Sequence, residues 1–286
     1  MRLAVLADTH GNLPALNAVL QELERHQVDG YIVAGDLTGG PQANETIRLL
    51  RELDCWMIQG NSDTNLLQYV AGGAPEGWYT SLQWALLRWT ARDISPDNLA
   101  FLQSLPAQRV VELANTSAIR VVHGSPRNPA EHLYPAFDPV AVNIAFRQIT
   151  EPVLVCGHTH IPWKLERDYR LILNPGAVCG PLNGELGAQY AMLTWEKKRW
   201  QPTHHLVTYD LRLIRKAFQE SGLLTEGGTL ARAFLLSIET GRNVAGGFLS
   251  HAYKLAATMG FTGQEIIPDS VWTKAAETFN WAEIKR

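Results

Sequence analysis

The sequence predicts an α/β protein built around a largely parallel sheet, with helical segments added to it. Short apolar runs alternate with helical patterns over the first 60 residues, which is typical of strand–helix–strand units. A helix-rich stretch at residues 64–108 interrupts this alternation, and helical patterns take over again from residue 208. Polar side chains follow five of the apolar runs, where open α/β sheets bind their ligands.

The first part of the sheet is predicted from three apolar runs, at residues 3–7, 31–34 and 55–59. Each is short enough for a buried strand. Helical patterns at residues 14–23, opened by a proline, and at residues 44–53 separate them. This order predicts parallel strands connected by crossover helices.

Residues 64–108 are interpreted as a helical insertion that packs on the edge of the sheet. Glycines and a proline punctuate it, and it contains Trp78, Trp84 and Trp89. Large aromatic side chains dominate protein cores, so we interpret these tryptophans as packing residues rather than a ligand platform.

The strand pattern returns after the insertion. It gives runs at residues 109–113 and 118–122, a helix at 139–149, a strand at 152–156, and two hairpins that pair 163–167 with 170–173 and 188–195 with 199–207. Residues 208–286 then form a predicted helical C-terminal subdomain. Its expected helices cover residues 210–221, 229–239, 244–259 and 268–279.

The bulk composition narrows the function. The 286 residues are 46% hydrophobic and 19% charged, as in ordinary globular proteins. A net charge of −3 argues against a general nucleic-acid or membrane-surface binder but leaves a nucleotide or a single phosphoester open as substrate. Cys55, Cys156 and Cys179 have no metal-type spacing and are interpreted as small buried hydrophobic residues. With no signal-peptide or membrane-span pattern, we expect a cytoplasmic protein.

Five strand ends carry the residues that indicate chemistry. They are Asp8-Thr9-His10, Gly35-Asp36, Gly60-Asn61-Ser62-Asp63, His123-Gly124 and Gly157-His158-Thr159-His160. Aspartate, histidine and asparagine suit divalent manganese, iron, nickel, cobalt or zinc. Two such ions need a shared carboxylate, for which Asp36 is the best candidate because it stands alone at its strand end. Paired metal sites perform in-line displacement at phosphorus, with a metal-bound hydroxide as nucleophile.

Each residue alone also has a structural explanation. Asp8 and Asn61 are residue types that cap helices or occupy turns, and His123 fits a loop histidine with satisfied hydrogen bonds. Asn174 precedes Pro175, a common turn arrangement. The five motifs together, rather than any one of them, favour a metal site.

In this order the motifs resemble those of the calcineurin-like metallophosphoesterase superfamily, over about residues 1–207. Leu173-Asn174-Pro175-Gly176 further resembles a loop of its small bacterial and archaeal phosphodiesterase-like branch. The resemblance implies a four-layer α/β/β/α sandwich of two mixed sheets flanked by helices. It therefore divides the chain into a catalytic domain at residues 1–207 and a helical subdomain at residues 208–286.

The resemblance also implies a ligand set for two divalent metal ions, with manganese the favoured ion. One ion would be bound by Asp8, His10, Asp36 and His160, and the other by Asp36, Asn61, His123 and His158. Asp36, Asn61 and His123 are in addition the candidate catalytic residues. Asp63 and Asn174 are candidates for supporting the ligands from outside the set.

One position departs from the family pattern. Many members have a histidine, thought to protonate the leaving group, where this chain has Ser62. A serine hydroxyl is a poor general acid near neutral pH, although it can donate a hydrogen bond to a phosphoryl oxygen. We therefore expect a preference for good leaving groups or a substitute acid. Arg127, as a phosphate clamp, and His132, as that acid, are candidates, each with a surface side chain as the alternative.

The predicted function is hydrolysis of a phosphodiester by a metal-bridging hydroxide, with a small phosphoester such as a nucleotide as substrate. A phosphomonoesterase or protein-phosphatase-like hydrolase is one alternative. A metal-binding scaffold without catalysis is another, and the C-terminal helices leave room for a protein partner.

Overall fold

A computed structural model describes residues 1–282, and the last four residues of the predicted C-terminal subdomain lie outside the described part. The first sheet has the strand order β10-β9-β1-β2-β3. Its strands are β1 (Arg2–Leu6), β2 (Gly30–Val33), β3 (Cys55–Met57), β9 (Ala188–Glu196) and β10 (Arg199–Val207). β1, β2 and β3 run parallel, whereas β9 and β10 complete the sheet in antiparallel fashion.

The second sheet has the order β4-β5-β6-β8-β7. Its strands are β4 (Arg109–Val111), β5 (Ile119–Val121), β6 (Val153–Val155), β7 (Trp163–Arg167) and β8 (Arg170–Asn174). β5, β6 and β8 are parallel, and the edge strands β4 and β7 are antiparallel to their neighbours. Both sheets are therefore mixed, as the resemblance implies.

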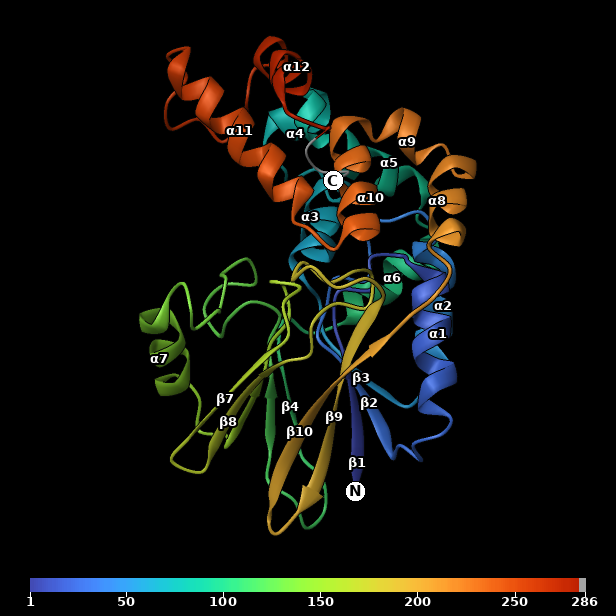
Figure 1. Cartoon of the computed structure of the whole chain (residues 1–286), viewed down its shortest axis with the longest axis vertical. Coiled ribbons are helices and arrows are strands. Elements are labelled where there is room, and N and C mark those ends of the chain that lie inside the picture. Colours follow the sequence, from blue (N-terminus) through green and yellow to red (C-terminus); the bar gives the residue numbers. More distant parts are fainter. Residues whose placement is uncertain (283–286) are drawn as a thin grey trace.

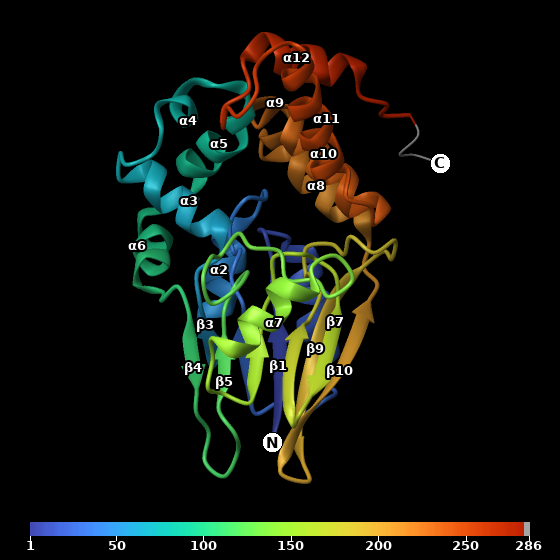
Figure 2. The same ribbon diagram turned by 90° about the vertical axis from the view of Figure 1, so that its left-hand side faces the viewer.

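The two sheets pack face to face through a core of small and β-branched side chains. Val5 and Ile32 from the first sheet and Val121 and Val155 from the second belong to this fully buried cluster. Helices α1 (Leu13–Leu23) and α2 (Ala43–Arg51) cover the outer face of the first sheet, and α7 (Pro139–Arg147) covers that of the second. The predicted four-layer sandwich is thus confirmed (Figure 2).

The remaining helices gather at one end of the sandwich, above the carboxyl ends of the parallel strands (Figures 1 and 2). Those from the insertion are α3 (Asn61–Val70), α4 (Glu76–Thr80), the 3-10 turn η1 (Leu82–Trp84), α5 (Ala85–Asp93) and α6 (Pro96–Ser104). Those from the C-terminal part are α8 (Leu211–Glu220), α9 (Leu223–Glu226), α10 (Gly228–Thr240), α11 (Val244–Thr258) and α12 (Asp269–Thr278). No described helix has the length and apolar character that a membrane span requires.

The insertion differs from the prediction that it packs on the sheet edge. Its two ends do so, where Leu66 of α3 and Leu102 of α6 join the core on the outer face of the first sheet. The middle of the insertion instead packs against the C-terminal helices, because Trp89 of α5 is buried in one cluster with Ile214 and Phe218 of α8. Gln83 likewise accepts a hydrogen bond from the backbone of Ile267 at 3.0 Å. We call the unit formed by α4, η1, α5 and α8–α12 the helical cap.

The tryptophans of the insertion have the packing role that the sequence predicts. Trp78 and Trp84 stack with ring centroids 3.9 Å apart, and Trp89 is 5% exposed. Trp89 is the side chain that links two segments far apart in the sequence.

Replacing Trp89 by alanine should therefore destabilise the cap. We expect Trp89→Ala to lower the free energy of unfolding by about 3–5 kcal/mol, the usual cost of deleting a large buried aromatic side chain. Urea unfolding followed by tryptophan fluorescence and circular dichroism measures it. Leu213→Ala, at a leucine of α8 that is 51% exposed, is the control and should change stability by less than about 0.5 kcal/mol. A loss below 1 kcal/mol for Trp89→Ala would contradict the proposed packing.

Candidate metal centre

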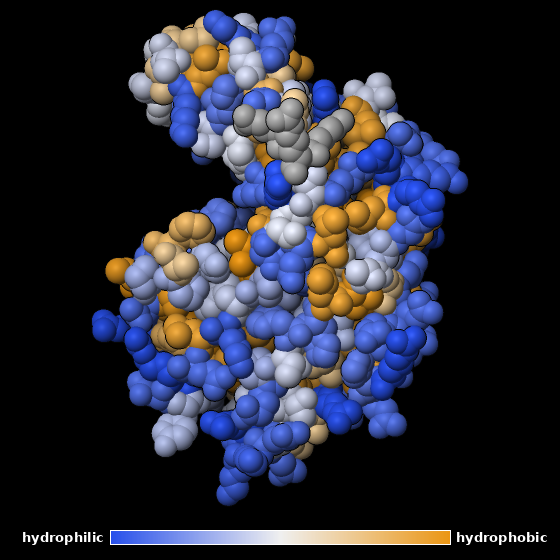
Figure 3. Space-filling model, viewed as in Figure 1, coloured by the Kyte–Doolittle hydropathy of each residue, from blue (hydrophilic) through white to orange (hydrophobic). Residues whose placement is uncertain are grey.

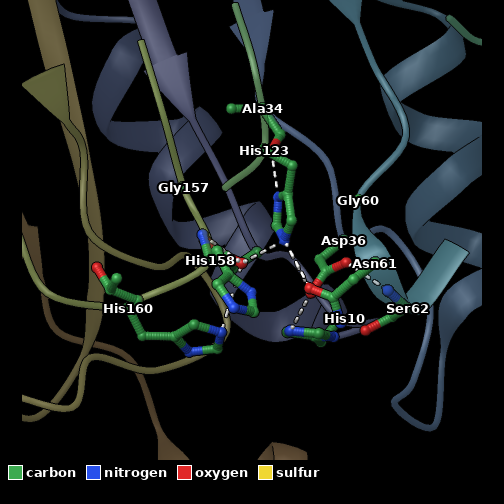
Figure 4. Close-up of polar contacts among 12 residues, drawn as sticks. His10, Ala34, Asp36, Gly60, Asn61, Ser62, His123, Gly157, His158 and His160 are labelled. Carbon is green, nitrogen blue, oxygen red and sulfur yellow. Dashed lines mark hydrogen bonds and ion pairs between the residues drawn. The ribbon is translucent and has the colours of Figure 1, made fainter. Parts of the chain in front are cut away.

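All seven predicted ligands lie at the carboxyl ends of strands. Figure 4 shows a common centre surrounded by His10, Asp36, Asn61, His123, His158 and His160, and Asp8 lies beside His123 and His160. Asp8 and His10 follow β1, Asp36 follows β2, Asn61 begins α3 after β3, His123 follows β5, and His158 and His160 follow β6. The loops between them are joined by backbone hydrogen bonds. The amide of Asp8 donates to Gly35 O at 3.0 Å, that of His10 to Asp36 O at 3.0 Å, and that of Gly157 to His123 O at 2.7 Å.

Five of these seven residues have a left-handed backbone conformation. They are Asp8, His10, Asp36, His158 and His160, with φ between 40° and 69°. Aspartate and histidine adopt this region more readily than most residues, but it remains uncommon. Such strain is retained mainly at functional sites, where it holds side chains in a required direction. Here it turns each ligand candidate toward the common centre immediately after its strand.

Asp36 lies at the centre of the first half of the site. Its Oδ2 is 3.4 Å from His10 Nε2 and 3.3 Å from His123 Nε2. The side-chain oxygen of Asn61 lies 3.1 Å from the same His123 nitrogen. The other oxygen of Asp36 accepts a hydrogen bond from the backbone amide of Ser62 at 2.8 Å. Oδ2 is thus left to face the imidazoles.

Asp8 has the equivalent position in the second half. Its Oδ1 is 3.4 Å from His160 Nε2 and 3.9 Å from His123 Nε2. The backbone amide of His158 donates to both of its oxygens, at 3.2 and 3.1 Å. Asp8 therefore plays no part in capping α1, since Asn12 fills that position.

Three imidazole rings are oriented by backbone carbonyls behind them. Nδ1 of His10 donates to Thr38 O at 2.7 Å, Nδ1 of His123 to Ala34 O at 2.7 Å, and Nδ1 of His160 to Gly180 O at 3.2 Å. A carbonyl can only accept, so the ring proton belongs on Nδ1. In a neutral ring this leaves a lone pair on Nε2, the arrangement usual for metal-binding histidines.

These contacts require a positive charge between the groups. Lone pairs on Nε2 face carboxylate oxygens at 3.3–3.4 Å, which is repulsive unless a proton or a cation separates them. Burial would lower the pKa of His123, yet the negative charges of Asp36 and Asp8 raise it to about 9. Burial would raise the pKa of Asp36, yet the charges of His123 and His10 hold it far below its usual range. The site is built for cations.

Divalent metals satisfy this need better than protons. Two ligand atoms each about 2.0–2.2 Å from one ion lie about as far apart as the 3.1–3.4 Å measured here. Burial and the neighbouring His123 lower the pKa of His158 to about 4, so its ring is neutral. Its Nε2 is also buried without a hydrogen-bond partner, and buried polar atoms are seldom left so. The residues therefore fit a metal centre.

Asp36 belongs to two groups of potential ligands at once. One contains Asp8, His10 and Asp36, and the other contains Asp36, His123 and His158. A carboxylate shared between two adjacent groups has the geometry that a bridging ligand needs. A third group of potential ligands consists of His10, His160 and Cys179.

Asp63 and Asn174 hold the loops that carry these ligands. The carboxylate of Asp63 accepts hydrogen bonds from the amides of Leu37, Thr38 and Gly60 at 2.9–3.2 Å, so it joins the Asp36 loop to the start of α3. Asn174 donates to Gly157 O at 2.7 Å and to the Thr159 hydroxyl at 3.1 Å. It thereby fixes the turn that contains His158 and His160.

The three candidates for substrate contact are placed differently. Ser62 and His132 line the cavity over the ligands, and the His132 ring lies 4.5 Å from that of His158. Arg127 does not line this cavity, because its guanidinium is paired with Glu131 four residues along. The structure therefore brings His132 to the site but leaves Arg127 outside it.

Two further residues contact the site, and no sequence motif identified either of them as a site residue. Cys179 lies with its sulfur 3.7 Å from His160 Nδ1. This contact is made to Nδ1, whereas Nε2 of the same ring faces Asp8, so Cys179 is a hydrogen-bonding neighbour of the His160 ring. Phe234 of α10 meets the His10 ring edge to face, with centroids 5.3 Å apart. Its contact depends on how the helical cap folds back, which local sequence patterns do not reveal.

A cavity of about 870 Å³ lies between the metal-ligand candidates and the helical cap. Its floor contains His10, Asp36, Asn61, His158 and His160, and its roof comes from α10 and α11. In the space-filling view it opens as a deep notch between the cap and the part of the sandwich that carries α7 (Figure 3).

Comparison with known proteins bears on this architecture. A sequence model of the calcineurin-like phosphoesterase superfamily domain matches residues 1–198. A metallophosphoesterase from Sphaerobacter thermophilus has 27% identity and a TM-score of 0.68, covering 84% of this chain and 99% of its own. That coverage exceeds residues 1–198, so the structural likeness extends beyond them.

Two other relatives are similar without adding an activity. A hypothetical protein from Pyrococcus horikoshii OT3 has a TM-score of 0.68 at 22% identity, covering 84% of this chain and 98% of its own, which is likeness in fold. An uncharacterized protein of Methanocaldococcus jannaschii is 29% identical over 238 residues, covering 76% of this chain and 90% of the relative.

Gly60 tests whether the position of Asp36 controls metal binding. A Cβ at this residue would lie 2.1 Å from Asp36 Oδ1 and 2.3 Å from the Asp36 amide, so Gly60→Ala must displace the carboxylate. We expect at least a tenfold weaker Mn²⁺ affinity by isothermal titration calorimetry, in line with losses seen when residues that orient metal ligands are changed. Gly73→Ala is the control, because its Cβ would have no neighbour closer than 3.8 Å. Equal affinities in the two variants would contradict the prediction.

Proposed function

Because the chain belongs to the calcineurin-like phosphoesterase superfamily, we propose that it is a metal-dependent phosphodiesterase with two divalent ions. The observation that carries this proposal is the convergence of imidazole lone pairs and carboxylate oxygens on Asp36 at 3.3–3.4 Å. A scaffold that had lost catalysis would have no need to keep this arrangement under a cavity. A small phosphoester is the proposed substrate.

In the proposed site, Asp8, His10, Asp36 and His160 would hold one ion, and Asp36, Asn61, His123 and His158 would hold the other. Asp36 would be the ligand that the two ions share. Nitrogen and oxygen ligands without a thiolate favour manganese, with iron, nickel, cobalt and zinc as alternatives. When bound, two such ions stabilise the phosphoryl oxygens as Lewis acids and provide a nucleophile at neutral pH.

Backbone groups of the chain orient the side chains that would bind the ions. The carbonyls of Ala34 and Thr38 keep the rings of His123 and His10 in the tautomer that presents Nε2. The amide of Ser62 keeps Asp36 turned toward the rings. Asn61 lines the wall of the cavity, and His123 lies behind it with Nε2 3.1 Å from the Asn61 side-chain oxygen. Ser62 also lines the cavity, and its hydroxyl is the proposed neutral donor for a phosphoryl oxygen.

A diester substrate is favoured over a monoester by the residue at position 62. Without a strong acid beside Asn61, the leaving group must depart with little proton assistance. His132 is within the cavity and is the alternative donor. A phosphomonoesterase remains the second candidate, distinguished by the assay below.

The location and organisation of the chain are part of the same proposal. Cys55, Cys156 and Cys179 are unpaired, and burial raises the pKa of the Cys55 thiol to about 12. Unreactive free thiols suit the reducing cytoplasm. We assign catalysis to the sandwich within residues 1–207 and substrate selection to the helical cap, in place of a protein-partner role.

Asp36→Asn should remove activity by weakening both ions. We expect bis-p-nitrophenyl phosphate turnover with Mn²⁺ to fall at least 100-fold, and bound manganese measured by mass spectrometry to fall with it, since the lost carboxylate serves both ions. Wild-type protein should prefer this diester to p-nitrophenyl phosphate. Asp97→Asn, at an exposed residue of α6, is the matched control. Full activity of Asp36→Asn would refute the bridging role, and a monoester preference would favour the second candidate.

The rate should depend on the leaving group. Across aryl methyl phosphodiesters of graded phenol pKa, we expect a steep decline as the phenol becomes less acidic, because no strong acid stands at position 62. Ser62→His should flatten the decline, and Ser62→Asn serves as its uncharged control. A flat dependence in wild-type protein, with chemistry rate-limiting, contradicts this expectation. If it then becomes steep in His132→Gln, His132 is the acid.

A further inference from the structure

The cavity over the metal-ligand candidates has a polar floor and an apolar roof. The roof consists of Leu230, Phe234 and Ile238 from α10 and Leu249 from α11, joined by Leu86 from α5. Phe234 contacts the His10 ring, so apolar surface begins directly beside the predicted metal ligands. A substrate reaching the floor must lie along this roof.

The charges around the cavity are unusual for a site that would bind a polyphosphate. No lysine or arginine is among the described residues that line it, whereas Glu131 and Asp138 are. Glu131 is neutralised by Arg127, and Asp138 accepts the Ala141 amide at 2.8 Å as the cap of α7. Phosphate groups beyond the one at the metals would have no cationic partner, and such partners are the usual means of binding them.

Two side-chain oxygens of the roof already make hydrogen bonds within the helices. The hydroxyl of Ser237 donates to Ala233 O at 3.0 Å and accepts the Ala245 amide at 3.1 Å. The side-chain oxygen of Asn243 accepts the Gly246 amide at 2.8 Å to cap α11. These two oxygens are therefore poorly placed to recognise a nucleobase. Their environment favours an apolar occupant.

Apolar side chains also extend from the roof to the mouth of the cavity. Tyr134 and Phe137 line it on the opposite side, with ring centroids 5.1 Å apart. Phe137 is 83% exposed, although exposing a large aromatic side chain is unfavourable. In Figure 3 these loops form the lower rim of the notch beneath α11. An apolar group bound in the notch would contact both the roof and these aromatic side chains.

We propose that the substrate is a phosphodiester with one negative charge and one long apolar ester group, alkyl or aryl. The phosphoryl group lies on the metal floor, and the apolar group lies against α10 and α11 with its end toward Phe137. This inference rests on the proposed function and adds the substrate class to it. It accounts for three observations: the described lining residues include no lysine or arginine, roof oxygens are hydrogen-bonded within the helices, and an aromatic side chain is exposed at the mouth.

The test compares p-nitrophenyl diesters that differ only in the second ester group: methyl, butyl, hexyl, and the polar 5′-thymidyl group. All carry one charge and the same leaving group. We expect kcat/KM with Mn²⁺ to rise at least about tenfold from methyl to hexyl, since each buried methylene is worth up to roughly fourfold. The thymidyl ester should fall below the hexyl ester.

Variants identify where the apolar group lies. Leu249→Gln should reduce the hexyl-to-methyl ratio at least about threefold. Phe137→Ser, at a side chain too exposed to matter for folding, should reduce it in the same direction. Leu213→Gln, on the exposed face of α8 away from this cavity, is the control and should leave the ratio and the rates unchanged.

A binding measurement separates this inference from the reaction. Calorimetry with ethyl and hexyl methylphosphonate, which carry one charge and lack the nitrophenyl leaving group, should give a lower Kd and a more negative heat-capacity change for the hexyl compound. If the diesters are hydrolysed with metal but kcat/KM and Kd do not change with the length of the alkyl group, only the proposed binding of an apolar ester group against α10 and α11 is overturned. If none of the esters is hydrolysed, the proposed reaction is overturned. The Kd values of the two phosphonates then decide whether the apolar group binds against α10 and α11. A thymidyl ester that outperforms the hexyl ester also overturns this proposed binding.

Discussion

The structure of the site depends on two buried carboxylates, Asp8 and Asp36, that face imidazole lone pairs. Asp8 is fully buried and Asp36 is 2% exposed, and isolated charges in such places are strongly disfavoured. The five loops that converge here can do so only if positive charge lies between them. The apolar core brings the two sheets together, and the need of Asp8 and Asp36 for positive charge at that junction creates the candidate metal centre.

Backbone geometry and electrostatics support each other at this point. Left-handed conformations cost about 1–3 kcal/mol each when the residue is not glycine, and five ligand candidates adopt them. The hydrogen bonds between the loops and the bracing by Asp63 offset this cost. These contacts hold the ligand candidates in defined directions, which is what precise positioning of a bound group requires.

Local patterns predicted the alternation of strands and helices and the polar strand ends, whereas the four-layer sandwich and the division of the ligands between two ions came from the family resemblance. A short apolar run ending in Asp8 or His123 is visible in a few residues, and parallel strands bring such ends together. The cap was less predictable. The burial of Trp89 against Ile214 joins segments more than 100 residues apart, and helical periodicity does not say which helices meet. The candidate role of Arg127 as a phosphate clamp is not supported by its position, because its guanidinium is paired with Glu131. A substrate phosphate would have to compete with this carboxylate.

The division between sandwich and cap also separates two kinds of selectivity. In the proposed function the floor would bind the phosphoryl group through charge, an interaction nearly the same for any phosphoester. The roof lies along the rest of the molecule, and Phe234 connects the two by contacting His10. Because the cap is assembled from the insertion and the C-terminal helices, changes in either segment alter the roof without moving a ligand. A strained, charge-balanced floor of this kind can therefore keep one chemistry while the cap changes the ester group that it accepts.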